Sequence, residues 1–200
     1  MLDDLQRLAN IGDAFRLEDD GPSISRNAVS TPTLTTDDTD SIDTAGPTSF
    51  AGLFDSSFGK DDFKDSDDND VADDDAISYA LGTTGGANVA SGLTDTLSNE
   101  SVVLNKVGND IVGTTATGGD EVLRISVVAT GANAGDVTFV QKRAVVHDDA
   151  TDPAETGASA AGFSAANLVT RSADHTSELQ SPKKRVCPIL HENRGGGGGG

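Results

Sequence analysis

The stretch Ser101–His147, SVVLNKVGNDIVGTTATGGDEVLRISVVATGANAGDVTFVQKRAVVH, decides the fold, because it carries the most sustained strand pattern in the chain. Within it, Leu123, Ile125 and Val127 alternate with polar residues. A period of two residues is typical of a strand with one buried face and one solvated face. The stretch therefore predicts β-strands.

Turn residues divide this stretch into two successive hairpins. Residues 102–107 and 111–115 are joined across Gly-Asn-Asp at 108–110, residue types that tolerate the left-handed backbone of a tight turn. Residues 121–128 and the run that opens at Val137 are joined by a glycine-containing turn and form the second hairpin. The sequence thus predicts an antiparallel β-meander.

Further strands are predicted on both sides of the meander. Residues 77–81 alternate as Ile, Tyr and Leu, residues 89–97 have the composition of a short strand, and residues 163–170 begin a last one. Short strands separated by turn residues predict an all-β fold, an antiparallel β-sandwich of the immunoglobulin-like kind, with disordered acidic loops and a disordered tail.

The segment before residue 60 is less regular. Val29 and Leu34 fit a short edge strand, because a proline lies between them. Phe50, Phe54 and Phe58 are spaced four residues apart, as on a helix, although the glycines among them favour a loop. We interpret these rings as core residues beneath the sandwich.

The acidic composition limits the kinds of molecule that this protein can bind. The formal net charge is -19, and the chain has no Trp, one Tyr and seven Phe. This charge repels phosphates and anionic lipids, so nucleic acid and membrane surfaces are excluded as partners. No apolar run approaches the length of a membrane helix, and the acidic start at Met1 is not a signal peptide. Chains this acidic are also often disordered, and that alternative stays open.

Residues 171–200 differ from the rest of the chain. Arg171-Ser172 and the segment from His175 to Ser181 resemble the translation of a common sequencing adapter, and six glycines close the chain. We predict a non-native disordered tail and exclude it from the fold. Without it the sequence has no cysteine, and so neither disulfides nor thiolate chemistry.

The order of short motifs along the chain suggests a family. The motifs are Glu18–Ile24, Thr36–Asp40, Gly46–Phe50, Phe58–Gly59, Ser78–Leu81, Ala90–Leu93, Val103–Leu104, Ile111–Gly113, Asp136–Thr138, Gln141–His147 and Ala166–Thr170. In this order they resemble a repeat module, a domain of unknown function, found in giant, type I-secreted, repetitive bacterial adhesins of the RTX class.

The resemblance implies an organisation and a context. Residues 1–16 would be the end of a preceding repeat, and residues 17–170 a β-sandwich module truncated at its last strand. The module would be a structural or adhesive unit of a secreted or cell-surface protein, with neighbouring repeats and an unknown surface ligand as partners. The other interpretation is a largely disordered acidic fragment with no function of its own.

The acidic stretch Asp61–Asp75 resembles an insertion relative to that module and invites a calcium interpretation. Calcium takes six to eight oxygen ligands, which aspartates supply. Asp65, Asp67 and Asn69 match the start of an EF-hand loop, but the glycine and the final glutamate that such a loop needs are replaced by Asp70 and Ala76. The EF-hand interpretation therefore fails.

Two looser calcium sites remain, and calcium there would stiffen an array of repeats by cancelling the repulsion between acidic units. The first lies at the expected joint between repeats and comprises Asp19, Asp20, Asp37, Asp38 and Asp40. The second draws on the acidic stretch, with Asp65 and Asp67 as ligands and Asp68, Asp70 and Asp73 as further candidates. A solvated acidic loop without an ion is the alternative for the second set.

No motif predicts catalysis. His147 is followed by Asp148 and Asp149, but no motif places a nucleophilic serine, and no P-loop, dinucleotide fingerprint or H-E-x-x-H motif occurs. We therefore expect a protein that is not an enzyme.

Overall fold

The computed structural model describes residues 21–37, 42–59, 63–67, 69, 71–147, 160–164 and 169–175, and these residues form an antiparallel, all-β fold without α-helices. The predicted fold class is confirmed. The strands are β1 (Ser23–Arg26), β2 (Asp43–Ser49), β3 (Phe54–Ser57), β4 (Ile77–Thr83), β5 (Val89–Thr94), β6 (Ser101–Val107), β7 (Asp110–Thr115), β8 (Glu121–Val127), β9 (Asp136–Gln141) and β10 (Val169–His175), with a short 3-10 turn, η2 (Ala51–Leu53), before β3.

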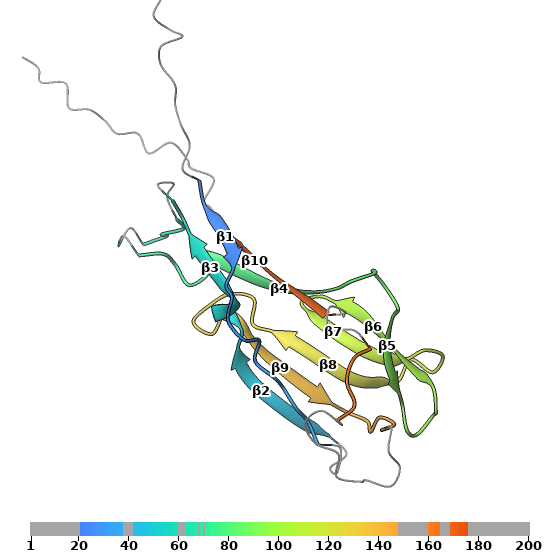
Figure 1. The fold of residues 1–200 in the computed structure, drawn as a ribbon. Helices are drawn as coiled ribbons and strands as arrows, with labels where there is room; N and C mark the ends of the chain where they lie inside the picture. Colours follow the sequence, from blue (N-terminus) through green and yellow to red (C-terminus); the bar gives the residue numbers. More distant parts are fainter. Residues whose placement is uncertain are drawn as a thin grey trace, which may run out of the picture.

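A six-stranded sheet forms the body of the molecule, in the order β2-β9-β8-β7-β6-β5 (Figure 1). Its strands β5 to β9 follow one another along the chain as a meander, as the pattern of residues 101–147 predicts. The β6–β7 hairpin turns at Gly108, whose φ of +63° lies in the left-handed region that glycine adopts without strain. The pairing of Val107 with Asp110 closes this hairpin in the predicted place.

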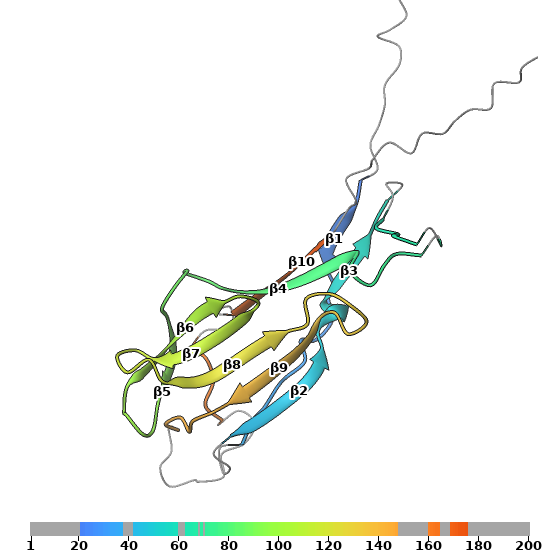
Figure 2. The same cartoon turned by 180° about the vertical axis from the view of Figure 1, so that it is seen from behind.

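A smaller second layer covers one face of this sheet. Strands β4 and β10 pair with each other, and β4 lies against β6, β7 and β8 (Figures 1 and 2). Strands β1 and β3 form a separate two-stranded sheet at one end of the molecule, where β1 also lies beside β10. The second layer over the large sheet is therefore the β4–β10 pair, and the β1–β3 pair lies beyond it.

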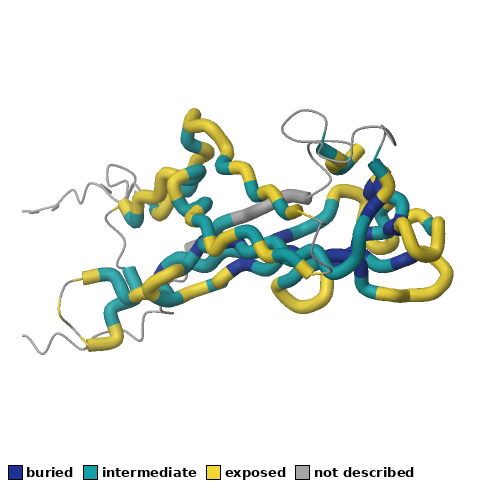
Figure 3. Tube along the Cα trace, turned by 90° about the horizontal axis from the view of Figure 1, so that it is seen from below, coloured by how far each residue is buried: buried dark blue, intermediate teal, exposed yellow. Residues whose placement is uncertain are grey.

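The core lies between the two layers. Its buried apolar side chains come chiefly from β6 to β9 and from β4, and they are Leu81, Leu93, Val102, Leu104, Ile111, Val122, Leu123, Ile125, Val127, Val137 and Val145. Figure 3 shows the buried positions along the strands and the exposed ones in the connecting loops. Gly113 is required in β7, because a Cβ atom there would lie 2.7 Å from Cγ of Leu123.

Both edges of the large sheet are modified. Edge strand β2 contains Pro47, which has no N–H to offer a further strand, and its register with β9 shifts between Ala45 and Thr48. At the opposite edge, the N–H of Ser164 donates to the carbonyl of Ser91 in β5 at 2.8 Å. Ser164 therefore lies beside β5, and the neighbouring Phe163 packs against the core.

A buried ion pair ties the β5–β6 turn to the chain after β9. Arg143 donates from Nε and an Nη atom to both carboxylate oxygens of Asp95, each at 2.8 Å, and the Asp95 side chain is fully buried. Ser98 also donates to this carboxylate, from its N–H at 2.8 Å and its hydroxyl at 2.6 Å. Another Nη atom of Arg143 lies 2.9 Å from the exposed carboxylate of Asp120.

One expectation for the N-terminal part, the edge strand at Val29 and Leu34, is wrong. Residues 27–37 contain no strand: Val29 is exposed, and Leu34 packs against the core from irregular backbone. The edge strand is instead β2, which the proline pattern also allows. The core interpretation of the three phenylalanines is confirmed for Phe50, which packs against the core, while Phe54 opens β3.

The boundary predicted after residue 170 falls inside β10. The backbone of Arg171–His175 continues the pairing with β4 that Val169 and Thr170 begin, while the truncation of the module at its last strand stays a prediction. The sequence pattern misses this extension because main-chain pairing needs no apolar alternation. Residues 1–16, predicted as the end of a preceding repeat, lie outside the described residues.

Candidate metal site in the acidic loop

The acidic stretch between β3 and β4 is anchored to the fold at its second half. The N–H of Gly131, in the β8–β9 turn, donates to the carbonyl of Asp74 at 3.0 Å. Lys64 forms an ion pair with Asp75 across the base of the loop. The N–H of Asp73 donates to the carbonyl of Lys64 at 2.7 Å, which brings the outgoing and returning chain together.

The outgoing part of the loop folds around Asn69. Its N–H donates to Oδ1 of Asp65 at 3.1 Å, and its side-chain amide donates to Oδ2 of Asp67 at 3.0 Å. Its own side-chain oxygen accepts the N–H of Val71 at 2.7 Å. Asn69 thereby places two carboxylates on the same side of the loop.

The returning part supplies a third carboxylate. Oδ2 of Asp73 accepts the N–H of Ser66 at 3.0 Å and its hydroxyl at 2.5 Å. These hydrogen bonds to the charged form lower the pKa of Asp73 below its ordinary value. Asp73 is therefore ionised at neutral pH and held over the outgoing chain.

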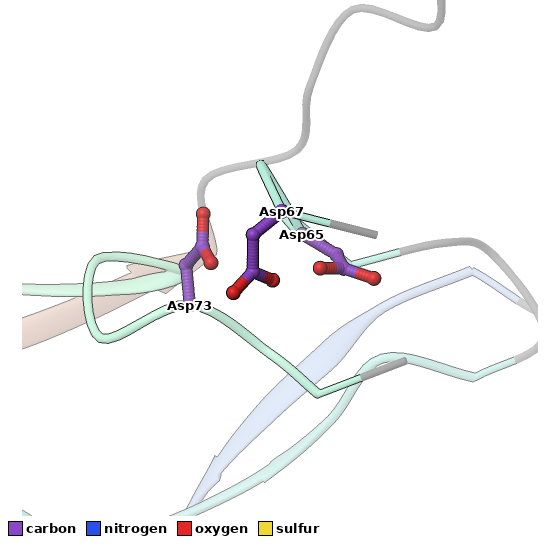
Figure 4. A group of neighbouring side chains, drawn as sticks. All are labelled: Asp65, Asp67 and Asp73. Atoms are coloured by element: carbon purple, nitrogen blue, oxygen red, sulfur yellow. The ribbon is translucent and has the colours of Figure 1, made fainter. Parts of the chain in front are cut away.

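The three carboxylates of Asp65, Asp67 and Asp73 face a common space (Figure 4). Each offers an oxygen, and the three oxygens lie within 4.8 Å of one another. Asp65 and Asp73 are half-buried and Asp67 is exposed. In the part of the chain that the structure describes, this is the group of acidic side chains that could hold a metal ion.

The chemistry of the donors fits a hard cation. All three side chains offer oxygen, and neither a histidine nor a cysteine belongs to the group. Oxygen-only sites are typical of calcium, magnesium and manganese, whereas zinc and copper select nitrogen and sulfur. The negative charges of the three carboxylates repel one another, as the effect of Asp65 on the pKa of Asp73 shows, and a divalent ion would remove this repulsion.

The three carboxylates keep part of the spacing of an EF-hand loop. Asp65, Asp67 and Asp73 stand at the first, third and ninth places of such a loop. The twelfth place is Ala76, which is 1% exposed and whose N–H donates to the carbonyl of Asp73. The usual bidentate ligand is therefore absent, and water would complete the shell.

The predicted ligands at the joint between repeats fare differently. Asp37 is described, and its N–H donates to Oδ2 of Asp43 at 2.7 Å, but it belongs to no group of three acidic side chains within the described residues. Asp19, Asp20, Asp38 and Asp40 lie outside those residues, as do Asp68 and Asp70. Of the predicted ligands, the structure brings together Asp65 and Asp67 with Asp73, which the sequence offered as a further candidate.

A comparison with known protein families assigns the chain to one of them. Residues 33–181 match the family described as Domain of unknown function (DUF5801). The chain belongs to this family. The DUF5801 match includes the acidic loop and all strands from β2 to β10. No curated protein and no solved structure matches the chain.

The DUF5801 match begins after β1 and reaches beyond residue 170, as β10 does. Within the described residues of this DUF5801 chain, we find no helix with the length and apolar character needed to cross a lipid bilayer.

Proposed function

We propose that this DUF5801 domain is a structural or adhesive repeat of a large secreted or cell-surface bacterial protein, stiffened by calcium bound in the acidic loop. The observation that carries the proposal is the convergence of Asp65, Asp67 and Asp73 on one space from two sides of an anchored loop. The resemblance of the motif order to RTX-class adhesin repeats supports the same context.

Calcium at this position would join the outgoing and returning halves of the loop. Without an ion, the carboxylates of Asp67 and Asp73 repel each other and favour an open loop. With calcium bound, the loop is cross-linked beside the start of β4, the strand that covers the core. Stiffening then follows from closing a loop of the second layer, with no change in the six-stranded sheet.

The expected affinity suits an extracellular setting. Exposed sites with few charged ligands in extracellular modules bind calcium with Kd on the order of 10⁻⁴ to 10⁻³ M. At about 10 mM calcium, binding of this strength stabilises the folded state by about 1.4 to 2.7 kcal/mol. Such a domain is stiff where calcium is millimolar and loosens where it is scarce.

The test is a calcium titration of the full chain after removal of bound ions with a chelator. Isothermal calorimetry measures the affinity, and urea unfolding with and without calcium measures the stabilisation. We expect Asp73→Asn to weaken calcium binding on the order of tenfold or more, because even outer-shell changes at metal sites cost roughly 10–100-fold in affinity. Calcium should slow limited proteolysis of the acidic loop in the unmodified chain more than in Asp73→Asn at the same calcium concentration.

Asp74→Asn is the matched control, since it removes the same charge from the neighbouring exposed position, whose side chain is outside the group of three. We expect this variant to bind calcium as the unmodified chain does. Equal stability in calcium and in chelator would overturn the calcium proposal. An equal loss of affinity in both variants would show general charge attraction in place of a defined site.

A further inference from the structure

A small cleft lies where the acidic loop meets the turn between β8 and β9. Its apolar lining includes Phe58 after β3, Ile77 and Tyr79 of β4, and Ala132 and Ala134 of the turn. Its volume is about 190 Å³, below the roughly 300 to 1,000 Å³ of sites for drug-sized ligands. The cleft therefore has the size for one side chain of a partner.

Two aromatic rings of the cleft are packed against further rings. Phe58 lies against Phe63 with ring centroids 5.6 Å apart, and Tyr79 lies against Phe54 at 6.4 Å. Half of the seven Phe and one Tyr of the chain thus gather beside the acidic loop. Aromatic faces carry negative partial charge and attract a cation above them. The apolar lining therefore favours a ligand that is both apolar and positively charged.

Carboxylates belong to the same lining. Asp73 and Asp74 contribute to it, and both also line a more open depression beside the cleft, together with Asn69 and Asp75. Asp74 is exposed, and among the described residues no lysine or arginine lies within ion-pair distance of its carboxylate, whereas Asp75 pairs with Lys64. Asp74 is therefore the carboxylate of the cleft that can receive a cation from a partner.

We propose that this cleft binds a lysine side chain on the surface of a partner protein. The four methylene groups of the lysine pack against Ile77 and the two rings, and its ammonium group lies beside Asp74. This arrangement suits lysine, whose stem covers apolar surface while its charged head stays in water. The formal net charge of -19 attracts basic partners over a longer range.

The lining disfavours other ligands. An anionic ligand is repelled by Asp73 and Asp74. A quaternary ammonium head without a stem, such as choline, is recognised by aromatic rings that enclose it, whereas two rings belong to the lining within the described part of the chain. An uncharged alkyl chain leaves the carboxylate of Asp74 without a partner.

This inference names a partner for the adhesive role and rests on that part of the proposed function alone. Asp74 lies outside the group of three carboxylates, and its carbonyl is held by the N–H of Gly131 at 3.0 Å without an ion. Lysine binding therefore does not require calcium. Its failure would leave the stiffening by calcium untouched, and a failure to bind calcium would leave lysine binding untouched.

Nuclear magnetic resonance of the full chain, labelled with ¹⁵N and kept in chelator, tests the proposal. The probe is the peptide Ac-Gly-Lys-Gly-NH2, added to about 20 mM because ligands of this size bind with Kd values in the millimolar range. The same peptide with norleucine keeps the stem without the charge, and choline keeps a positive charge without the stem. We expect the lysine peptide alone to shift the amide signals of Gly131, Ala132 and Ala134 in a saturable way.

Three variants locate the binding, and each should keep the calcium affinity of the unmodified chain. Asp74→Asn should raise the Kd of the lysine peptide about fivefold, the loss expected for an exposed ion pair. Ala132→Leu fills the cleft and should abolish the saturable shift without changing the charge. Asp55→Asn, the matched control, removes the same charge from an exposed position of β3 outside the lining and should leave the Kd nearly unchanged.

Four results would overturn the proposal. The absence of a saturable shift with the lysine peptide would remove the site. Equal binding of the norleucine peptide or of choline would show that the cleft does not select a stem with a charged end. Equal weakening by Asp74→Asn and Asp55→Asn would show general attraction to an acidic chain. A full response in Ala132→Leu would place the binding outside the cleft.

Discussion

Replacing Asp95 by asparagine tests the electrostatics of the turn between β5 and β6. The carboxylate of Asp95 is fully buried and receives two hydrogen bonds from Arg143 and two from Ser98. The hydrogen bonds from Arg143 are the main reason that the pKa of Asp95 falls from its ordinary 3.8 to about 2. The amide of the variant keeps the shape of the side chain but removes the charge.

The lowered pKa of Asp95 makes the free energy of unfolding depend on pH. A difference of about 1.8 pKa units corresponds to about 2 kcal/mol of favourable interaction with the charged form. Because the folded pKa is depressed, this stabilisation is fully present above about pH 4 and is lost as pH falls towards about 2. Asp95→Asn should lack this component at every pH.

At neutral pH we expect Asp95→Asn to lower the free energy of unfolding by about 3 kcal/mol. Removing one partner of a buried ion pair typically costs about 3 to 5 kcal/mol, and the low end applies because Arg143 keeps its contact with Asp120. The assay is urea unfolding followed by far-UV circular dichroism, in chelator and at constant ionic strength, from about pH 6 to pH 2.

The gap in stability between the unmodified chain and Asp95→Asn should shrink by about 2 kcal/mol over the acidic half of this range. Glu121, whose pKa is also lowered by hydrogen bonds, contributes equally to both proteins and cancels in the difference. Glu100 contributes slightly more to the variant, because the charge of Asp95 opposes the lowered pKa of Glu100 in the unmodified chain. Asp120→Asn removes the exposed partner of the same guanidinium and should cost less than about 1 kcal/mol. A gap that stays constant with pH would refute the reasoning.

Two further predictions concern packing and are measured by the same unfolding assay at pH 7. Gly113→Ala places a Cβ atom 2.7 Å from the Leu123 side chain and should destabilise the folded state by about 1 to 3 kcal/mol. The control Gly52→Ala, with nothing within 4 Å of its Cβ atom, should leave the stability nearly unchanged, and equal effects of the two variants would contradict the packing argument. Leu104→Ala should lower the free energy of unfolding by about 2 to 5 kcal/mol, because this side chain is fully buried. The control Leu97→Ala, at an 84% exposed position, should cost at most about 0.5 kcal/mol. A cost below about 1 kcal/mol at Leu104 would mean that the core is not where we place it.

The sequence predicts the parts of the fold in which local pattern and tertiary packing agree. Ile125 and Val127 alternate with polar residues in β8 and enter the core, and Gly108 marks the β6–β7 turn. In both places the residue types are typical of one local structure, a half-buried strand in β8 and a tight turn at Gly108. Pattern analysis succeeds there because each strand has one buried face and each turn has a residue suited to its backbone.

The pattern fails where pairing depends on the main chain or on distant partners. Strand β2, with Pro47 in it, has no apolar alternation and is positioned by its pairing with β9. Strand β10 is similar, since its last five residues show no strand pattern in the sequence and are placed by their backbone pairing with β4. Such strands are positioned by the strand they pair with, and a local sequence pattern does not identify that strand.

The candidate metal site was predictable in part. Asp65 and Asp67 follow from their spacing, but Asp73 joins them because Ser66 and Lys64 hold the returning chain against the outgoing one. The ninth-place spacing from Asp65 is the signal that separates Asp73 from the other candidates, Asp68 and Asp70. A run of aspartates offers many such spacings, so hydrogen bonding within the loop decides among them.

The placement of β1 and β10 beside each other at one end has a mechanical consequence (Figures 1 and 2). A pull applied to the chain through these two strands enters and leaves the domain at the same pole, so the six-stranded body is not in the line of force. The β10–β4 ladder would then open like a zipper, one hydrogen bond after another, in place of shearing all at once. Such a domain yields at low force and lengthens in steps, and its core unfolds last.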